Sequence, residues 1–376
     1  MAGCRIIIGQ IGMNKLKVSS DTSAFEVPAV LDETGKLAND CVRQALAMMD
    51  THGLVILTGL LSDAEADAGL GLIRQTVDDP DRNRCAFASQ TDNRYQRRDF
   101  CSLPSSPPVT QFAATLCQRL EAVISPYCGR PHPLLEVTTL TSYLGSSHQY
   151  IHRDPSGVIS MFAAVEDVSE QQGGTVFVPG TQLFDGAKHK HGAEATAMME
   201  LFRTRCNYTI LWHNLKKLWG MRKSAEAPLA SGEFFDRVFS TKWDEHQPNL
   251  TRFALGKNSQ FSLRMLGPGT LWKLYRRRKA LDKMFALIQT APGKGTVILY
   301  QSDLLHAGPD NRAPQPRRFF SMSLARGFVE PKLWHDGYSP HPTLKAQPMS
   351  FGDLLDCPTH SAPSGVPDDH AEALVS

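Results

Sequence analysis

The sequence predicts an α+β fold in which helices brace a β-barrel or β-sandwich. Two observations predict it. Apolar residues recur at helical spacing up to about residue 124, whereas alternating runs rich in Thr, Val and Tyr follow from residue 134 onward. Helices first and strands afterwards are typical of the α+β class. With 376 residues, 41% of them hydrophobic, the chain is long enough to bury a large core.

The first part of the chain is predicted to hold three helices and one strand. Helical spacing begins at Leu37 and ends at Gly53, after which LVILTG forms a short apolar strand. Two more helices are expected over 62–77 and 109–124. The segment 85–106 is polar, and we expect it to be irregular.

Five later segments carry the strand pattern: 134–145, 158–168, 174–181, 295–308 and 317–327. A long insertion, 185–292, separates the third from the fourth, and its composition is helical and basic. Two interpretations of its Leu-, Trp- and Arg-rich stretches stay open. Their apolar side chains pack on the barrel while the basic ones lie in solvent, or Arg276 and its neighbours face an anionic substrate.

We expect one domain over 26–355, with the insertion forming a helical lid that carries selectivity. Residues 1–25 are expected to be loosely ordered, and 356–376 have the Pro, Ser and Asp content of a disordered tail.

The bulk composition limits the classes of partner. The formal net charge of +2, from 40 basic and 38 acidic residues, produces no overall field of the kind that attracts nucleic acid. The eight cysteines form no C-x-x-C pair, which favours reduced thiols and an intracellular, cytoplasmic location. No run of about 18 apolar residues predicts a transmembrane segment.

The stretch YIHRDPSG (150–157) contains the first candidate metal ligands. Residues two apart in an extended chain point to the same face, so His152 and Asp154 can aim at one point. The alternative is a strand end whose polar side chains are hydrated before the Pro-Gly turn. His306 ends the apolar run VILYQSDLLH before another Gly-Pro turn, at an equivalent strand end.

Two imidazoles and one carboxylate on one face of an iron ion leave the other face open, an arrangement diagnostic of non-haem Fe(II) oxygenases. A 2-oxo acid and dioxygen occupy the open positions. The far carboxylate of the 2-oxo acid calls for a guanidinium, and Arg317 stands eleven residues after His306.

These motifs resemble one known family. HRD, the turn GGTVFVPGTQ, and HAGPDNR with its arginine eleven residues beyond the histidine are similar to the phytanoyl-CoA dioxygenase-like family of Fe(II)/2-oxoglutarate-dependent oxygenases. The likeness runs from about Leu54 to Gly327. It implies a double-stranded β-helix, a jelly-roll or cupin-like barrel. By matching position it implies the iron ligands and catalytic residues His152, Asp154 and His306.

The resemblance also implies the co-substrate site. Arg317 would clamp 2-oxoglutarate, and Phe162 falls where many members carry a tryptophan beside it. Gly308 replaces a serine that helps the same carboxylate in some members. Thr141 and Tyr143, on one strand face with Thr139, are candidates for that hydrogen bond, although β-propensity explains them equally well.

The predicted activity is oxidation of an unactivated C–H bond by Fe(II), O2 and 2-oxoglutarate, by hydroxylation, desaturation or ring closure, with release of succinate and CO2. The ligand carboxylate, Asp154, disfavours halogen transfer, since related halogenases lack it. Arg97, Arg98, Arg276 and Arg326 are the candidate contacts to a small, carboxylate-bearing substrate of secondary metabolism.

Two alternatives remain. One is a non-catalytic metal-binding scaffold or sensor whose basic insertion binds a partner; the complete set of four site residues argues against it. The other is an oxygenase that modifies protein or nucleic acid, of which the near-neutral charge disfavours nucleic acid. The sequence makes no prediction of oligomeric state.

Overall fold

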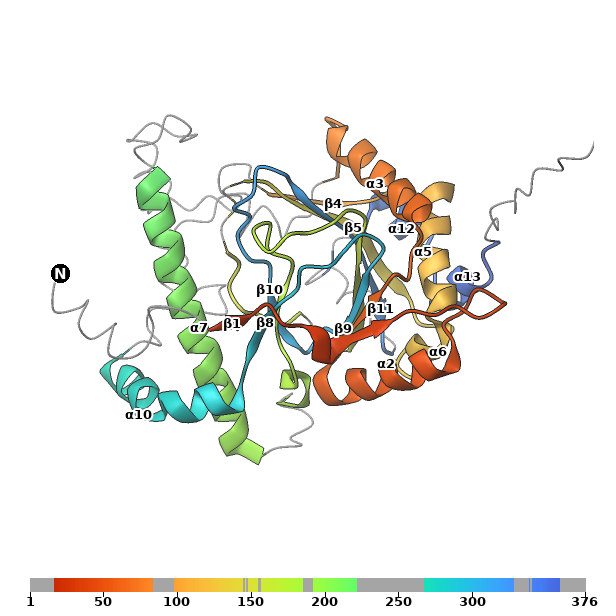
Figure 1. The fold of residues 1–376 in the computed structure, drawn as a ribbon. Coiled ribbons are helices and arrows are strands. Elements are labelled where there is room, and N and C mark those ends of the chain that lie inside the picture. Colours follow the sequence, from red (N-terminus) through yellow and green to blue (C-terminus); the bar gives the residue numbers. More distant parts are fainter. Residues whose placement is uncertain are drawn as a thin grey trace, which may run out of the picture.

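Two β-sheets lie between two groups of helices (Figure 1). The computed structural model describes residues 17–83, 98–144, 146, 148–154, 157–184, 192–221, 267–327, 338 and 340–358.

The larger sheet has seven strands in the order β2-β3-β9-β6-β11-β5-β4. Their bounds are, in that order, Glu26–Pro28, Leu54–Thr58, Val297–Gln301, Val158–Ala164, Arg317–Ala325, Leu134–Ser142 and Arg98–Ser102. Neighbouring strands are antiparallel except β2 and β3, which are parallel. Strands β6 and β9 are buried along their whole length, as expected for a sheet covered on both faces.

The smaller sheet has the order β1-β8-β7-β10. Its strands are β1 (Val18–Ser19), β8 (Leu287–Gln289), β7 (Val176–Val178) and β10 (Leu305–Ala307). The segment 149–152 continues this sheet beyond β10. His152 forms an antiparallel bridge with His306, and the Gln149 N–H donates to the Gly308 carbonyl over 2.8 Å.

An aromatic core joins the inner faces of the two sheets. Phe162, Tyr300 and Phe319 come from the larger sheet and Phe177 from the smaller. The rings of Phe177 and Tyr300 lie 5.3 Å apart between centroids, and those of Phe162 and Phe319 lie 5.5 Å apart. The sheets are therefore held face to face, with the inner face of each turned toward the other.

Most of the described helices cover the outer face of the larger sheet. They are α2 (Asn39–His52), α3 (Asp63–Asp78), α5 (Pro107–Arg119), α6 (Glu121–Ile124) and α13 (Phe351–Leu355). Helix α3 begins in a capping box, in which the Ser62 hydroxyl and the Glu65 carboxylate each accept the other residue's backbone N–H. The shorter elements are η1 (Ser23–Phe25), η3 (Thr181–Phe184) and α12 (Pro342–Ala346).

Two helices of the insertion cover the outer face of the smaller sheet. Helix α7 (Gly192–Met221) and helix α10 (Pro268–Met284) lie together on the opposite side of the molecule from α2, α3 and α5 (Figure 1). Met199 and Phe202 of α7 pack with Ile151 and Val176 in one buried cluster. The lid prediction also concerns residues 222–266, which lie outside the described part of the chain.

The structure corrects four sequence-based boundaries. The predicted strand 295–308 is two strands in different sheets, because a turn, in which the Leu304 N–H donates to the Gln301 carbonyl, carries the chain from β9 to β10. Strand β4 lies in the segment predicted to be irregular, β8 lies in the predicted insertion, and β1 lies in the N-terminus expected to be loosely ordered. Such short strands carry little pattern of their own unless they are strongly apolar, as β3 is, so pairing with partners distant in sequence decides them. No described helix is both long and apolar enough to cross a membrane.

Candidate metal centre

The three predicted ligands meet at the edge of the smaller sheet. His152 and His306 form an antiparallel bridge at this edge. The His152 N–H donates to the His306 carbonyl over 3.0 Å, and the His306 N–H donates to the His152 carbonyl over 2.9 Å. Asp154 follows two residues later, and its own N–H donates to the Ser302 carbonyl, at the turn between β9 and β10. Strand pairing therefore brings together residues separated by about 150 positions.

One ligand atom from each residue lies within 4.8 Å of the other two, so this group can bind a metal ion. The Asp154 carboxylate is 3.8 Å from His152 Nε2 and 3.3 Å from His306 Nε2. Two ligand atoms that lie at right angles around one ion, each roughly 2.1 Å from it, are about 3 Å apart. Small side-chain movements would therefore bring these three residues to coordinating distance of one ion. His306 is almost fully buried, whereas Asp154 keeps 32% of its side chain exposed.

Backbone carbonyls orient both imidazoles. The Nδ1 atom of His152 lies 2.6 Å from the Tyr150 carbonyl, and that of His306 lies 2.9 Å from the Leu304 carbonyl. A carbonyl only accepts, so each Nδ1 carries the proton and donates. Each Nε2 is then the basic nitrogen, the form in which a histidine binds a metal with its other nitrogen held.

Electrostatics couples the carboxylate to the imidazoles. Burial opposes ionisation of Asp154, but the charge of His306, its hydrogen bond and the charge of His152 together lower the pKa of Asp154. Burial likewise opposes a charged His306, but Asp154 raises the pKa of His306 above its ordinary 6.5. The Asp154 carboxylate and a protonated His306 therefore stabilise each other.

Arg317 is fully buried at the start of β11. Its Nη1 donates to the carbonyls of Gln172 and Gly174 over 3.2 Å and 2.8 Å, and its Nη2 donates to the Ser142 hydroxyl over 2.9 Å. A Cβ added at Gly308 would lie 3.5 Å from Nη2. The guanidinium is thus held rigidly, with one edge beside the loop that follows His306.

Phe162 lies on the inner face of β6 and is 9% exposed. Its ring is 5.3 Å from that of Tyr300, and the Tyr300 ring is 5.2 Å from that of His306. Phe162 is therefore one aromatic ring away from the metal ligands, in the core between the sheets.

The structure does not bring Thr141 or Tyr143 to Arg317. Arg317 pairs with Ser142 in the β11–β5 register, so the neighbours of Ser142 in the chain point to the opposite face. The Tyr143 hydroxyl there donates to Asp99 over 3.2 Å. The sequence predicts that side chains of this strand alternate between its two faces. Which of the two faces turns toward Arg317 is set by the pairing register of β5 with β11. Ser142 is the residue that sequence reasoning missed.

Of the arginines expected at the substrate, Arg97 lies outside the described residues, and Arg98 pairs with Ser142 at the start of β4. Arg276 is exposed on α10, with its guanidinium 5.9 Å from the Trp272 ring centroid. Arg326 donates to the Gln301 side chain over 2.8 Å and lies over the Tyr127 ring. Neither Arg276 nor Arg326 contacts a metal ligand through these interactions.

A polar row on the inner face of the larger sheet was also missed. Ser160 and Ser323 lie 3.1 Å apart between hydroxyls, and Ser323 donates to the Glu136 carboxylate over 3.4 Å. All three are buried. The signal was present, because each polar residue occupies an inward position in a strand whose neighbouring residues are apolar.

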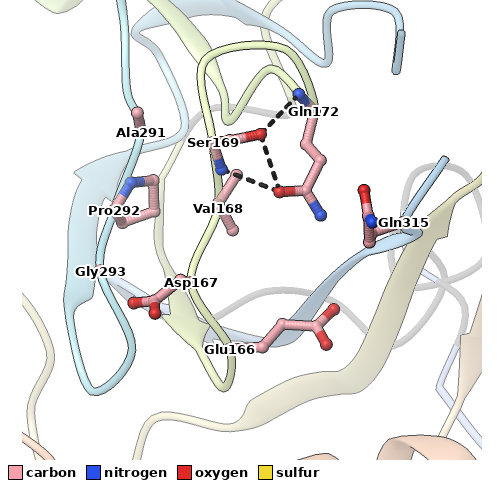
Figure 2. A pocket seen from close by; sticks show the side chains of 9 residues that line it. All are labelled: Glu166, Asp167, Val168, Ser169, Gln172, Ala291, Pro292, Gly293 and Gln315. Carbon is pink, nitrogen blue, oxygen red and sulfur yellow. Dashed lines mark hydrogen bonds between the residues drawn. The ribbon is translucent and has the colours of Figure 1, made fainter. Parts of the chain in front are cut away.

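A separate cavity of about 530 Å³ is lined by Glu166, Asp167, Val168, Ser169, Gln172, Ala291, Pro292, Gly293 and Gln315 (Figure 2). Its lining includes none of the metal ligands. The Ser169 hydroxyl and backbone N–H both donate to the Gln172 side chain, which closes the turn on one side of the cavity (Figure 2). We assign it no part in the candidate site.

No protein-family model and no curated protein matches this sequence. Among solved structures, the chain is similar to the non-heme alpha ketoglutarate dependent epimerase SnoN from nogalamycin biosynthesis (13% identity, TM-score 0.44, 77% of this chain and 84% of that one). It is also similar to the carbocyclase SnoK from the same biosynthesis (12%, 0.43, 83% and 94%) and to HygX from Streptomyces hygroscopicus with nickel and 2-oxoglutarate bound (16%, 0.40, 81% and 98%). These values are too low for the likeness to assign a family or an activity.

Proposed function

We propose that this protein is an Fe(II)- and 2-oxoglutarate-dependent oxygenase acting on a small molecule. The observation that carries the proposal is the convergence of His152, Asp154 and His306, with both Nε2 atoms and the carboxylate gathered at one point. Two histidines and one carboxylate suit iron chemistry with open positions. The two facing sheets support the double-stranded β-helix implied by the family resemblance.

Bound Fe(II) would supply the oxidising chemistry at an unactivated C–H bond, using O2 and 2-oxoglutarate and releasing succinate and CO2. In this proposal Arg317 holds the far carboxylate of 2-oxoglutarate with a charge-assisted hydrogen bond. Ser142 orients the guanidinium through the 2.9 Å contact to Nη2. Phe162 provides the apolar wall between the co-substrate and the core.

The proposal covers three possible reactions of the substrate C–H bond: hydroxylation, desaturation or ring closure. It also concerns the charge of the substrate. A carboxylate-bearing substrate was predicted from local arginines, but Arg276 and Arg326 are engaged elsewhere. Glu136 on the inner wall favours hydrogen-bond donors instead. A substrate screen should therefore include amines and polyols beside carboxylates, each scored by succinate release.

The test is an anaerobic titration of Fe(II) and 2-oxoglutarate followed by an assay for succinate. We expect a weak visible charge-transfer band and succinate formation on admission of O2. Asp154→Ala should abolish both while the protein stays folded, because this ligand is partly exposed and is not a core residue.

The matched control is Glu170→Ala, which removes an exposed carboxylate and should leave the band and the succinate yield unchanged. If the protein binds metal but shows neither the charge-transfer band nor succinate formation with any candidate substrate, the oxygenase proposal is rejected. The metal-binding scaffold or sensor would then be the remaining interpretation.

A further inference from the structure

We propose that Asn207 of helix α7 is a positioning residue for the metal centre, and that docking of α7 and metal binding are thermodynamically linked. The inference rests on the metal site of the proposed function but not on turnover. It gives the insertion a task that its sequence did not suggest.

Asn207 holds the backbone of the residue next to a ligand at two points. The Ile151 N–H donates to Asn207 Oδ1 over 2.6 Å, and Asn207 Nδ2 donates to the Ile151 carbonyl over 3.0 Å. Asn207 is 1% exposed and Ile151 is fully buried. Both hydrogen bonds are therefore shielded from water.

The geometry follows from strand pairing. The N–H and carbonyl of His152 point toward β10 and bond to His306, so those of Ile151 point to the opposite edge. At that edge Asn207 supplies the donor and the acceptor that a neighbouring strand would have supplied. A side-chain amide is the natural group for this purpose, because it carries both functions side by side.

Further contacts join α7 to the same region. Ile151 packs with Phe202 and Cys206 of α7 in one buried cluster. The Arg153 guanidinium contacts Met199 Sδ at 3.6 Å. On the segment that follows the third ligand, the carboxylate of Asp310, four residues after His306, lies 3.3 Å from His213 Nε2. Helix α7 thus touches both chain segments that carry the ligands.

The mechanical consequence concerns His152. Its Nδ1 is held by the Tyr150 carbonyl and its backbone by His306, so its place depends on the segment 149–152 staying extended. Without Asn207, the buried Ile151 peptide groups would lose their partners, and the segment would leave that conformation more often. Because linkage is reciprocal, metal binding that fixes His152 also favours docked α7.

The experiment measures Ni(II) affinity by calorimetry, with no co-substrate and no turnover. Asn207→Ala should weaken Ni(II) binding roughly 10- to 100-fold, the range typical when a group that orients a ligand is lost. Thr209→Ala is the control on the same helix, since its buried hydroxyl donates to the Arg205 carbonyl within α7. It should leave Ni(II) affinity unchanged.

Hydrogen exchange provides the reciprocal measurement. In the wild type, Ni(II) should slow amide exchange both in residues 148–153 and in α7. In Asn207→Ala it should slow exchange only in 148–153. If Asn207→Ala does not fold, Asn207→Asp keeps the acceptor for the Ile151 N–H and loses the donor. That variant should also weaken Ni(II) binding, because a carboxylate oxygen would face the Ile151 carbonyl where the Asn207 donor now lies.

The outcomes separate the two proposals. Equal Ni(II) affinity in the wild type and the Asn207 variants, or no protection of α7 by metal, would overturn the linkage while leaving the oxygenase intact. Normal linkage without succinate formation would reject the oxygenase alone. A wild type that binds no Ni(II) would overturn the metal centre and this inference together.

Discussion

At the scale of single residues, both histidine ligands use the same local arrangement. In each, Nδ1 donates to the carbonyl of the residue two positions earlier: Tyr150 for His152 and Leu304 for His306. This arrangement needs an extended backbone and no further side chain. It leaves Nε2 as the metal-binding atom at both sites, although the two segments have unrelated sequences.

The pKa of His306 gives a pH prediction for metal-free protein. Burial disfavours the imidazolium, but the charge and hydrogen bond of Asp154 raise the pKa above 6.5. Stability contributed by the protonated ring is therefore present below the unfolded value and is lost as pH rises through the folded pKa. Metal requires the unprotonated ring, so Ni(II) affinity rises over the same interval.

An NMR titration of the His306 ring measures this directly. We expect a midpoint above 6.5 in metal-free wild type and a lower midpoint in Asp154→Asn, which keeps the shape of the side chain and removes its charge. A wild-type midpoint at or below 6.5 would contradict the prediction.

Arg317 and Arg318 provide a matched pair on one strand. Arg317 faces the core between the sheets, whereas Arg318 pairs with Glu166 at 3.1 Å on the other face. Arg317→Lys keeps the charge but loses the planar fork. We expect the KM for 2-oxoglutarate to rise roughly 10- to 100-fold, the equivalent of a charge-assisted hydrogen bond of about 1.5–3 kcal/mol.

Arg318→Lys should leave that KM unchanged. The measurement is succinate formation as a function of 2-oxoglutarate concentration. Equal effects of the two substitutions would show that Arg317 supports the strand rather than the co-substrate.

At the scale of elements, the turn between β9 and β10 decides where His306 lies. β9 belongs to the larger sheet and β10 to the smaller, and the carbonyl of Ser302, in the turn between them, accepts the Asp154 N–H. One turn therefore determines the position of two ligands. A continuous strand over 295–308 would have kept His306 in the larger sheet, away from His152.

Alanine substitutions at two glycines of helix α3 should change the free energy of unfolding in opposite directions. A Cβ at Gly69 would lie 2.7 Å from the Phe112 ring and 2.9 Å from Val165, whereas a Cβ at Gly71 would meet nothing within 4 Å. Gly69→Ala should destabilise the protein by about 1–3 kcal/mol, as overpacking does. Gly71→Ala should stabilise it by about 0.5–1 kcal/mol, since alanine favours the helix.

Urea unfolding of both variants, monitored by circular dichroism, is the measurement. A loss of stability in Gly71→Ala would mean that α3 packs differently on that face.

At the scale of the whole molecule, metal binding should raise the melting temperature. A ligand at 100 times its Kd that binds only the folded state stabilises it by about 2.7 kcal/mol. For a chain of this length that corresponds to an increase of several degrees. Differential scanning calorimetry with Ni(II) should show this increase, and a chelator should reverse it.

Asp154→Ala is the control for that measurement and should show no metal-dependent increase. The six cysteines in the described residues form no disulfide, and five of them are buried. A thermal shift that persists in Asp154→Ala would point to those thiols or to another site as the place of metal binding.

Much of the arrangement was predictable from local patterns. Helices α2, α3 and α5 and strands β3, β5, β6 and β11 coincide closely with the segments predicted from periodicity. The candidate ligands were also predictable, because His152 and Asp154 share one face of an extended segment and His306 ends another. These features depend on residues close together in the chain, and a sequence pattern records such residues directly.

Pairing between distant segments decided the rest. The choice of Ser142 over Thr141 beside Arg317 follows from the β11–β5 register, and the hold of Asn207 on Ile151 joins residues 56 positions apart. By itself the sequence determined which residues carry metal-binding groups and on which kind of element. Only the tertiary structure decided which face each strand turns inward and which helix completes the sheet edge, because register and docking are set by hydrogen bonds and packing between segments with no local signature.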